Sequence, residues 1–462
     1  MALNMNADRG LKAYDQSDFL AQKMARTEPM PDDAKATQMS NLSRGRVLVV
    51  GDDMRIFLAV ARSLGRAGYA VHAAPFNWRA PALASRYISQ THFLTRYSDN
   101  PEAWLAEIKA VVTQNDLQVV IPCCDRAILP LDRHRAELGP AILAIPGQRA
   151  METLFDKAKT KALAETLDIP VSPGEQLTSS QSASELIARF GLPVVIKPKR
   201  SYSIDHLTTW GRVYIAESLQ ELTTILASVN EPERYLVEKY FKGGVGVGVS
   251  VLARRGEIIQ AFQHRRLREG WGGSSSLRVS EDCDPALLEA ATRICAAMQI
   301  HGVCMFEFRR NAADGSWILL EVNARLWGSV PLPVGMGVDF PRALCELLLD
   351  RPLSLPVPYK AGVRSRNTVL DGWNLLNATR HGRFENLRAG LLAWTDYLAQ
   401  PIWWVVGREH SDSFTLDDPA PGFAEIWDLL KRIARRDSSE PDRRQGDKSA
   451  TVRLAGLIRP AT

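Results

Sequence analysis

The sequence predicts an α/β domain with a Rossmann-like layout, followed by a mixed α+β domain and a mostly helical C-terminal extension. Residues 47–50 form an apolar strand pattern, residues 56–67 have helical apolar spacing, and residues 70–74 return to a strand pattern. This is the βαβ order of a parallel sheet. In the middle of the chain, two strand patterns flank turn residues and predict a β-hairpin. After Asp350, prolines mark a linker, and helical spacing follows in residues 370–398.

Length and composition indicate an ordinary globular protein. The 462 residues suffice for roughly two to four domains, and 45% hydrophobic with 24% charged residues is typical of globular chains. The net charge of +5 is small for this length, so we expect no nucleic-acid partner. The sequence contains no apolar run of about 18 residues, and its start lacks the apolar core of a signal peptide.

The six cysteines show neither paired C-x-x-C spacing nor a disulfide framework. We therefore expect reduced, mostly buried thiols and no zinc site. Reduced thiols are typical of the cytosol, and we predict a cytoplasmic protein.

Shifts in composition divide the chain into five segments. We expect a flexible N-terminal segment over residues 1–44 and a Rossmann-like domain over residues 45–150. A second domain covers residues 151–350, a helical extension covers residues 351–434, and a charged, disordered tail covers residues 435–462.

The first domain is not expected to bind a dinucleotide. Its third αβ unit runs from residues 104–112 into residues 119–122, but the turn after the first strand is Gly51-Asp52-Asp53 rather than G-x-G-x-x-G. The close backbone approach to a pyrophosphate is therefore not provided. We expect this domain to pack beside the active domain and to help hold substrate. Residues 123–125 follow the last strand, where such sheets expose their ligand edge.

The hairpin in the middle of the chain carries the strongest candidate site. Glu307 lies between two phenylalanines in the first strand, and Glu321, Asn323 and Arg325 alternate along the second, so these three share one face. Such polar groups among apolar neighbours are costly to bury without a partner charge. Mg²⁺ held by these oxygen ligands and by phosphate oxygens would satisfy them. The alternative is an exposed hairpin face on which Arg325 pairs with a glutamate.

Segments upstream of the hairpin supply cations. Lys197 closes an apolar strand and needs a negative partner, either a nucleotide phosphate or a carboxylate. Lys157 lies at the start of a basic helix. Residues 243–249 alternate glycine with valine, which is typical of a strand whose glycine face is approached closely by a bulky group. The cationic segment 263–266 and the Gly/Ser loop that leads to Arg278 suit an anionic group.

In their order along the chain, these motifs resemble the ATP-grasp superfamily. The motifs are Asp156-Lys157, Val195-Ile196-Lys197-Pro198, Val237-Glu238-Lys239-Tyr240-Phe241, Phe306-Glu307-Phe308 and Glu321-Val322-Asn323-Ala324-Arg325. Each motif alone is weak, but five in this order are specific. The chain is most similar to carboxylate–amine ligases, the large chain of carbamoyl-phosphate synthase and biotin carboxylase, over about residues 46–350. The resemblance implies a Rossmann-like pre-ATP-grasp domain followed by an ATP-grasp domain.

The resemblance also implies how ATP would be bound. Lys157 and Lys197 would contact the nucleotide phosphates. The adenine pocket would be lined by the segment Glu238, Lys239, Tyr240 and Phe241, with Glu238 toward the amino group of the base.

For the metal and the reacting group, the resemblance implies a second set of residues. Glu307 and Glu321 would bridge two Mg²⁺ ions, and Asn323 would complete the shell of one; Mn²⁺ is an alternative ion. Arg325 would steady the transferring phosphoryl group, and Arg278 is our second candidate for holding an acyl phosphate.

The chain departs from the superfamily pattern in two places. Many members carry a glycine-rich flap after the strand lysine, whereas residues 198–203 contain no glycine. The segment from Arg265 to Arg278 is a candidate source of comparable charge. Many members also place an acidic residue for the ribose where this chain has Gly248.

The aromatic and apolar residues 391–406 allow two interpretations. One is a helix that binds a membrane interface or a partner. The other, which we favour, is a helix packed on the preceding domain, because Asp396 and Pro401 interrupt the apolar run.

We predict an ATP-dependent, Mg²⁺-dependent ligase. ATP would phosphorylate a carboxylate, and an amine would displace phosphate from the acyl phosphate; two metal ions would screen the repulsion between the triphosphate and the carboxylate. The partners would be a small carboxylate and a small amine, and a homodimer is left open. The alternatives are an ATP-binding scaffold or regulator without turnover, and a phosphotransferase on the same fold.

Overall fold

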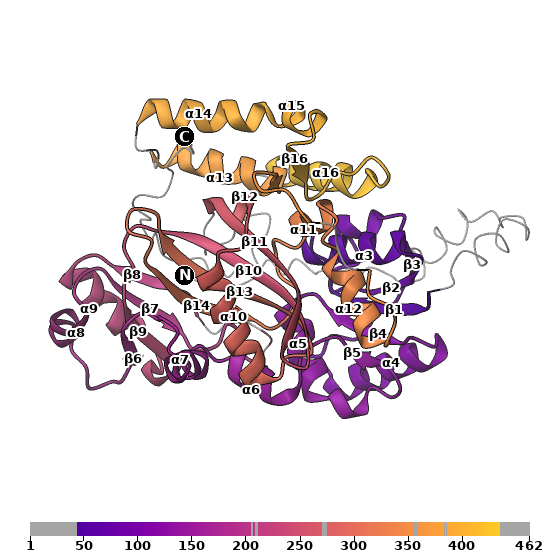
Figure 1. The fold of residues 1–462 in the computed structure, drawn as a ribbon, viewed down its shortest axis with the longest axis horizontal. Coiled ribbons are helices and arrows are strands. Elements are labelled where there is room, and N and C mark those ends of the chain that lie inside the picture. Colours follow the sequence, from indigo (N-terminus) through magenta and orange to yellow (C-terminus); the bar gives the residue numbers. More distant parts are fainter. Residues whose placement is uncertain are drawn as a thin grey trace, which may run out of the picture. The chain divides into compact units, whose positions relative to one another are not determined.

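The computed structural model describes residues 44–204, 207, 211–269, 275–354, 358–382, 384 and 386–434. The predictions for the N-terminal segment before residue 44, for the Gly/Ser loop at 270–274 and for the tail from 435 lie outside the described residues. Figure 1 shows the described helices and strands in chain order.

The first domain contains the predicted parallel sheet. Its five strands have the order β3-β2-β1-β4-β5, and every pairing is parallel. The βαβ prediction is confirmed, and the sequence missed the short strands β3 and β5. The elements are β1 (Arg46–Val50), α3 (Ile56–Arg66), β2 (Ala70–Ala74), η1 (Pro81–Ala84), β3 (Ile88–Thr91), α4 (Pro101–Gln114), β4 (Val119–Pro122), α5 (Asp125–Arg133), η2 (Arg135–Glu137), β5 (Ile142–Leu143) and α6 (Gln148–Leu154).

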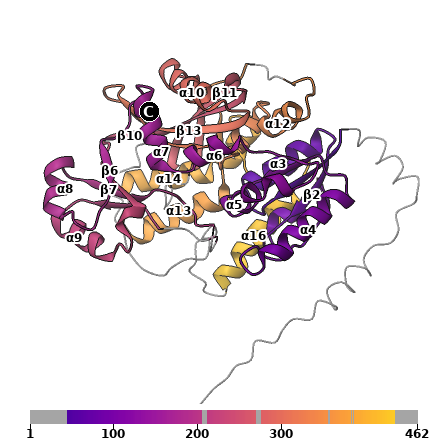
Figure 2. The ribbon, with the colours of Figure 1, turned by 90° about the horizontal axis from the view of Figure 1, so that it is seen from below.

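A four-stranded sheet of order β6-β9-β7-β8 follows. Helices α8 and α9 lie beside each other next to this sheet (Figure 2), and their apolar residues share a core with those of β7 and β9. The elements are α7 (Lys157–Thr166), β6 (Gly174–Gln176), α8 (Ala183–Phe190), β7 (Val194–Pro198), β8 (Tyr214–Ala216), α9 (Leu219–Ser228), η3 (Pro232–Arg234) and β9 (Tyr235–Lys239).

A seven-stranded sheet of order β14-β13-β10-β11-β12-β15-β16 carries the predicted hairpin as β13 and β14. One buried core joins Leu48 and Val120 of the parallel sheet to Val249 and Phe306 of this sheet, so the first domain packs directly against it. The elements are β10 (Gly244–Arg254), β11 (Glu257–Glu269), β12 (Ser275–Glu281), α10 (Pro285–Met298), β13 (Gly302–Asn311), β14 (Trp317–Asn323), α11 (Pro331–Gly335) and α12 (Phe340–Leu348).

The C-terminal extension is mostly helical, as predicted, but it also completes the large sheet. Strand β15 pairs with β12, and β16 pairs with β15, so two short strands from the extension form the sheet edge. Nothing in the described part of the chain is a helix long and apolar enough to cross a bilayer. The elements are β15 (Arg364–Arg366), α13 (Thr368–Arg380), α14 (Leu387–Leu398), α15 (Gln400–Val405), β16 (Glu409–Ser411) and α16 (Ala420–Ala434).

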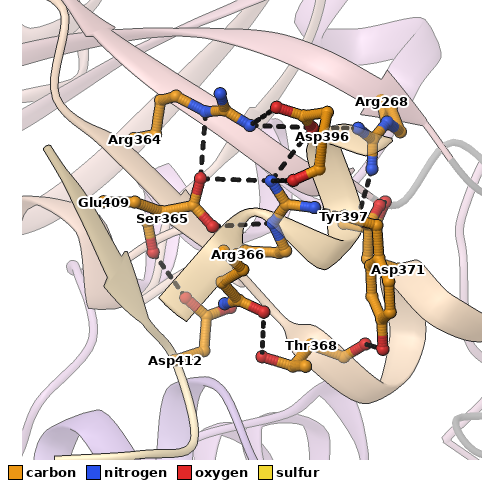
Figure 3. A network of polar contacts seen from close by, with 12 residues as sticks. Arg268, Arg364, Ser365, Arg366, Thr368, Asp371, Asp396, Tyr397, Glu409 and Asp412 are labelled. Carbon is orange, nitrogen blue, oxygen red and sulfur yellow. Dashed lines mark hydrogen bonds and ion pairs between the residues drawn. The ribbon is translucent and has the colours of Figure 1, made fainter. Parts of the chain in front are cut away.

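A network of buried ion pairs fastens the extension to the sheet (Figure 3). Arg366, which is fully buried, contacts Asp371 at 3.0 Å, Asp396 at 3.0 Å and Glu409 at 2.7 Å. Arg268 of β11 also pairs with Asp371 and Asp396. Because each buried charge here has an opposite charge beside it, the network satisfies its own members without a ligand.

Removal of one partner from this buried layer should destabilise the protein strongly. Asp412 and Arg278 form an ion pair in which both side chains are fully buried. We expect Asp412→Ala to lower the free energy of unfolding by about 3–5 kcal/mol, because Arg278 would remain buried without its anion. Denaturant unfolding measures the loss. The exposed pair between Glu289 and Arg293 is the control, and Glu289→Ala should cost less than about 1 kcal/mol. Equal losses of stability in Asp412→Ala and Glu289→Ala would show that the buried ion pair is not a main contributor to stability.

Candidate functional site

Two carboxylates face each other across the central hairpin. In the β13–β14 ladder Glu307 lies directly opposite Glu321, and Met305 lies opposite Asn323. The amide of Asn323 donates to Glu321 at 3.3 Å. A bulge follows Glu307, and one extra residue of β14 is accommodated there. The register therefore places Glu307 on the same face as Glu321 and Asn323.

Each carboxylate has its own cation in this structure. The Lys157 ammonium lies 3.4 Å from Glu321, and the Arg266 guanidinium lies 2.6 Å from Glu307. The Glu307 side chain is 13% exposed and that of Glu321 is 32% exposed. The exposed, solvated hairpin face that the sequence left open is therefore not what the chain forms.

The two carboxylates differ in their affinity for protons. Burial raises the pKa of Glu307, although the neighbouring Arg266 opposes that shift. Burial would also raise the pKa of Glu321, but the Lys157 ammonium and the Asn323 amide outweigh it and lower that pKa. Glu321 is consequently an anion at neutral pH, ready to bind a cation.

The start of α7 explains the Asp-Lys motif. Asp156 is the N-cap of α7, and its carboxylate accepts hydrogen bonds from the backbone N–H groups of Ala158 and Lys159. The backbone N–H of Lys157 donates to the carbonyl of Lys199 just beyond β7. These bonds hold Lys157 at the end of the strand that contains Lys197.

Lys197 forms a second cationic centre. Its ammonium lies 2.7 Å from Glu238, which is buried, and the ammonium of Lys161 lies 4.0 Å from the same residue. Burial lowers the pKa of Lys161. All three residues line one cavity together with Lys157, Thr160, Val171, Ser172, Leu319 and Leu320. The cavity therefore has an apolar wall and a polar, mainly cationic wall.

The rest of the predicted adenine segment lies at the end of β9. Lys239 closes this strand, and its N–H donates to the carbonyl of Pro173. The N–H of Tyr240 donates to the carbonyl of Pro193, and Phe241 packs against Gly244. Their contact with a base stays a prediction.

The glycine face of β10 makes room for two side chains, as its pattern predicts. A Cβ on Gly248 would lie 2.2 Å from the ring of His264, and one on Gly246 would lie 2.7 Å from the Arg266 side chain. Arg266 can therefore cross the sheet to reach Glu307. Burial, together with the neighbouring charges of Arg266 and Arg278, lowers the pKa of His264 to about 3, so the ring is neutral.

Arg325 joins the hairpin to the first domain. It lies just beyond β14, and its Nε donates to Asp125 at 2.8 Å. Asp125 begins α5, and only Cys123 and Cys124 separate it from the carboxyl end of β4. The ligand edge of the parallel sheet and the carboxylate face of the hairpin therefore meet at this ion pair.

Arg278 is a predicted site residue that the structure places away from this group. Its side chain is fully buried, and its guanidinium donates to Asp412 and Ser365. Because this guanidinium is fully buried, a substrate phosphate cannot reach it, whereas the side chain of Arg325 is 17% exposed.

Three residues at the site had no assigned role in the sequence analysis: Arg266, which was noted only as part of a cationic segment, Lys161, and Asp125 as the partner of Arg325. The glycine–valine alternation was the signal for Arg266, since it required a bulky neighbour. The spacing of Lys157 and Lys161 by four residues, which puts both on one helix face, was the signal for Lys161. No signal in the sequence joined Asp125 to Arg325, which lies 200 positions away.

The donor set fits a magnesium nucleotide. The described residues contain no group of three or more His, Cys, Asp or Glu side chains that could hold an ion by themselves. Mg²⁺ is commonly bound by one or two carboxylates together with substrate phosphates. Glu307, Glu321 and Asn323 supply such oxygens, and the ammonium group of Lys157 lies beside Glu321.

Comparison with protein families and curated relatives gives matches to an ATP-grasp family model and to carbamoyl phosphate synthase large chains. The family model described as "ATP-grasp in the biosynthetic pathway with Ter operon" matches residues 231–369. The chain is 26% identical over 312 residues to the carbamoyl phosphate synthase large chain of Thermomicrobium roseum. This matched region covers 59% of this chain and 28% of the relative. The large chain of Deinococcus radiodurans is 25% identical over 237 residues, or 49% of this chain and 22% of that one. The chain thus spans about a quarter of these relatives.

Solved structures share the fold. The biotin carboxylase domain dimer of Hydrogenobacter thermophilus 2-oxoglutarate carboxylase, in complex with MgADP, ADP and bicarbonate, gives a TM-score of 0.55 at 15% identity, covering 69% of this chain and 73% of that one. N5-carboxyaminoimidazole ribonucleotide synthetase from Thermus thermophilus gives 0.53 at 16% identity, covering 68% and 81%. The predicted resemblance and fold class are confirmed.

Proposed function

The chain has an ATP-grasp fold behind a Rossmann-like domain, and from this premise we propose that it is an ATP-dependent ligase that joins a carboxylate to an amine. The observation that carries the proposal is the pairing of Glu307 with Glu321 across the hairpin, beside Lys157. Two facing, partly buried carboxylates repel each other. Lys157 and Arg266 offset that repulsion here, and Mg²⁺ would do so when Lys157 turns to the nucleotide.

We propose that Glu307, Glu321 and Asn323 hold Mg²⁺. The ion would screen the charge of the triphosphate from that of the attacking carboxylate. When the nucleotide enters, Lys157 would turn from Glu321 to a phosphate. Lys197 would share its charge between Glu238 and the nucleotide, and the segment from Glu238 to Phe241 would receive the base.

The reaction would proceed in two displacements. An oxygen of the substrate carboxylate would attack the γ-phosphorus of ATP, and ADP would leave with the bond electrons. The amine would then attack the acyl carbon, and inorganic phosphate would leave as the amine loses a proton. Arg325, held by Asp125, would steady the phosphoryl oxygens during both displacements. No protein nucleophile is required.

The setting of the enzyme is also a proposal. All six cysteines are free, and four of them are buried, as predicted for reduced thiols. This supports a cytoplasmic enzyme with small-molecule substrates. The dimeric biotin carboxylase neighbour makes a homodimer the oligomer to test first.

An ADP-release screen tests the function. The purified protein with Mg-ATP is supplied with small carboxylates and amino acids, singly and in pairs with ammonia or a primary amine. Ligation predicts ADP and free phosphate in equal amounts only when both partners are present. ADP without free phosphate would indicate a phosphotransferase, and nucleotide binding without turnover of any pair would indicate a scaffold; either result would overturn the proposal.

A further inference from the structure

The outer face of α14 and α15 is apolar. Leu387, Leu391, Leu398, Ile402 and Val405 are between 60% and 84% exposed. Ala399 links the two helices with helical backbone angles of φ −77° and ψ −3°, so the helical path is almost continuous. At 3.6 residues per turn, these five side chains fall within about 60° of one another. They form one stripe along both helices, which we call the outer stripe.

This arrangement is the reverse of an ordinary surface helix, which turns its polar face to water. Asp396 points away from the outer stripe into the ion-pair network, where it accepts from Arg364 and Arg366 (Figure 3). Pro401 lies in the first turn of α15, where proline is well tolerated. The two residues that argued against an interaction helix therefore leave the outer stripe uninterrupted.

The helices lie on the outside of the extension. Figure 1 shows α14 and α15 in line along one edge, with α13 between α14 and strand β12. The buried face of α14 contributes Gly390 and Ala393. Exposed contiguous apolar surface of this extent is uncommon in a free monomer and marks an interaction site.

The charges around the outer stripe are of one sign. Between residues 368 and 411, the described acidic residues Asp371, Asp396 and Glu409 all pair with arginines of the network. Arg380, Arg388 and Arg408 are exposed, and the part of the chain that the structure describes gives them no ion pair. Among these described residues, the surface therefore combines an apolar stripe with unpaired cations and no free acid.

We propose that α14 and α15 rest on the surface of an anionic lipid bilayer. The outer stripe would enter the headgroup region, and the three arginines would lie against lipid phosphates. Trp404, 37% exposed at the end of α15, suits the interface between headgroups and acyl chains. A second copy of the chain would bring the same unpaired arginines together, which repel, so the charge pattern favours lipid.

Vesicle co-sedimentation of the full chain tests the proposal. Binding is measured with phosphatidylcholine alone and with phosphatidylcholine plus phosphatidylserine. We expect at least about tenfold tighter binding to the anionic vesicles, falling as salt is raised. Leu398→Glu and Val405→Glu should each weaken binding at least about tenfold, and the Arg388→Gln/Arg408→Gln variant should remove most of the preference for phosphatidylserine.

The matched control is Leu219→Glu, at a leucine of α9 that is 50% exposed. It should bind vesicles like the wild type. Analytical ultracentrifugation of all variants shows whether a second copy of the chain, rather than lipid, covers the outer stripe. Absence of vesicle binding, an equal loss in Leu219→Glu, or a dimer that Leu398→Glu dissociates without any vesicle binding would each overturn the proposal.

Discussion

Replacing Glu321 with glutamine is expected to reduce turnover by about a thousandfold or more. The substitution keeps the size of the side chain but removes the anion that Lys157 and Asn323 hold ionised. The charge stabilisation supplied by a bound metal is worth several kcal/mol, and each 1.4 kcal/mol is about a tenfold change in rate. The measurement is the rate of ADP release with the substrate pair that the screen identifies.

A glutamate on the same sheet provides the control. Glu281 of β12 is partly buried and pairs with Arg265 and Arg310, away from the hairpin carboxylates. Glu281→Gln should keep turnover within a fewfold of the wild type. If Glu321→Gln turns over as fast as Glu281→Gln, Glu321 is not part of the active site.

The second large effect is expected at Lys197. Lys197→Met should weaken the binding of ATP by about 10- to 100-fold, because a charged hydrogen bond to phosphate is worth about 1.5–3 kcal/mol. Calorimetric titration with a non-hydrolysable ATP analogue measures the affinity. Lys199→Met is the matched control, since Lys199 lies two residues further on and its ammonium donates to Gln176.

Loss of Lys197 also leaves the buried Glu238 with Lys161 alone, 4.0 Å away. The double variant Lys197→Met/Glu238→Gln removes this unpaired charge. It should recover thermal stability relative to Lys197→Met without recovering affinity for the analogue. Recovery of affinity would mean that Lys197 only neutralises Glu238 and does not contact the nucleotide.

Local patterns predicted the elements that carry the site. The hairpin and the shared face of Glu321 and Asn323 follow from a period of two along residues 305–309 and 319–325. The register that sets Glu307 opposite Glu321 came from the structure. The βαβ start and the lysine at the end of β7 follow from apolar runs in the same way. These features depend on neighbours within a few residues, so one sequence is enough to find them.

Features that depend on distant residues could not be predicted. Arg278 follows a Gly/Ser loop whose composition is typical of an anion-binding segment. It nevertheless pairs with Asp412, 134 positions away. Strands β15 and β16 are three residues long and carry charged residues, so no period marks them. The apolar residues of the outer stripe are present in the sequence, but Asp396 was expected to interrupt them. The ion-pair network shows that its side chain points away from the stripe.

The dependence of nucleotide binding on magnesium tests the central claim most directly. Affinity for the ATP analogue is titrated at increasing Mg²⁺ in the wild type, Glu307→Gln and Glu321→Gln. If the two carboxylates hold the ion, Mg²⁺ will tighten binding at least about tenfold in the wild type, and each variant will lose most of that gain. The same magnesium dependence in all three proteins would contradict the account.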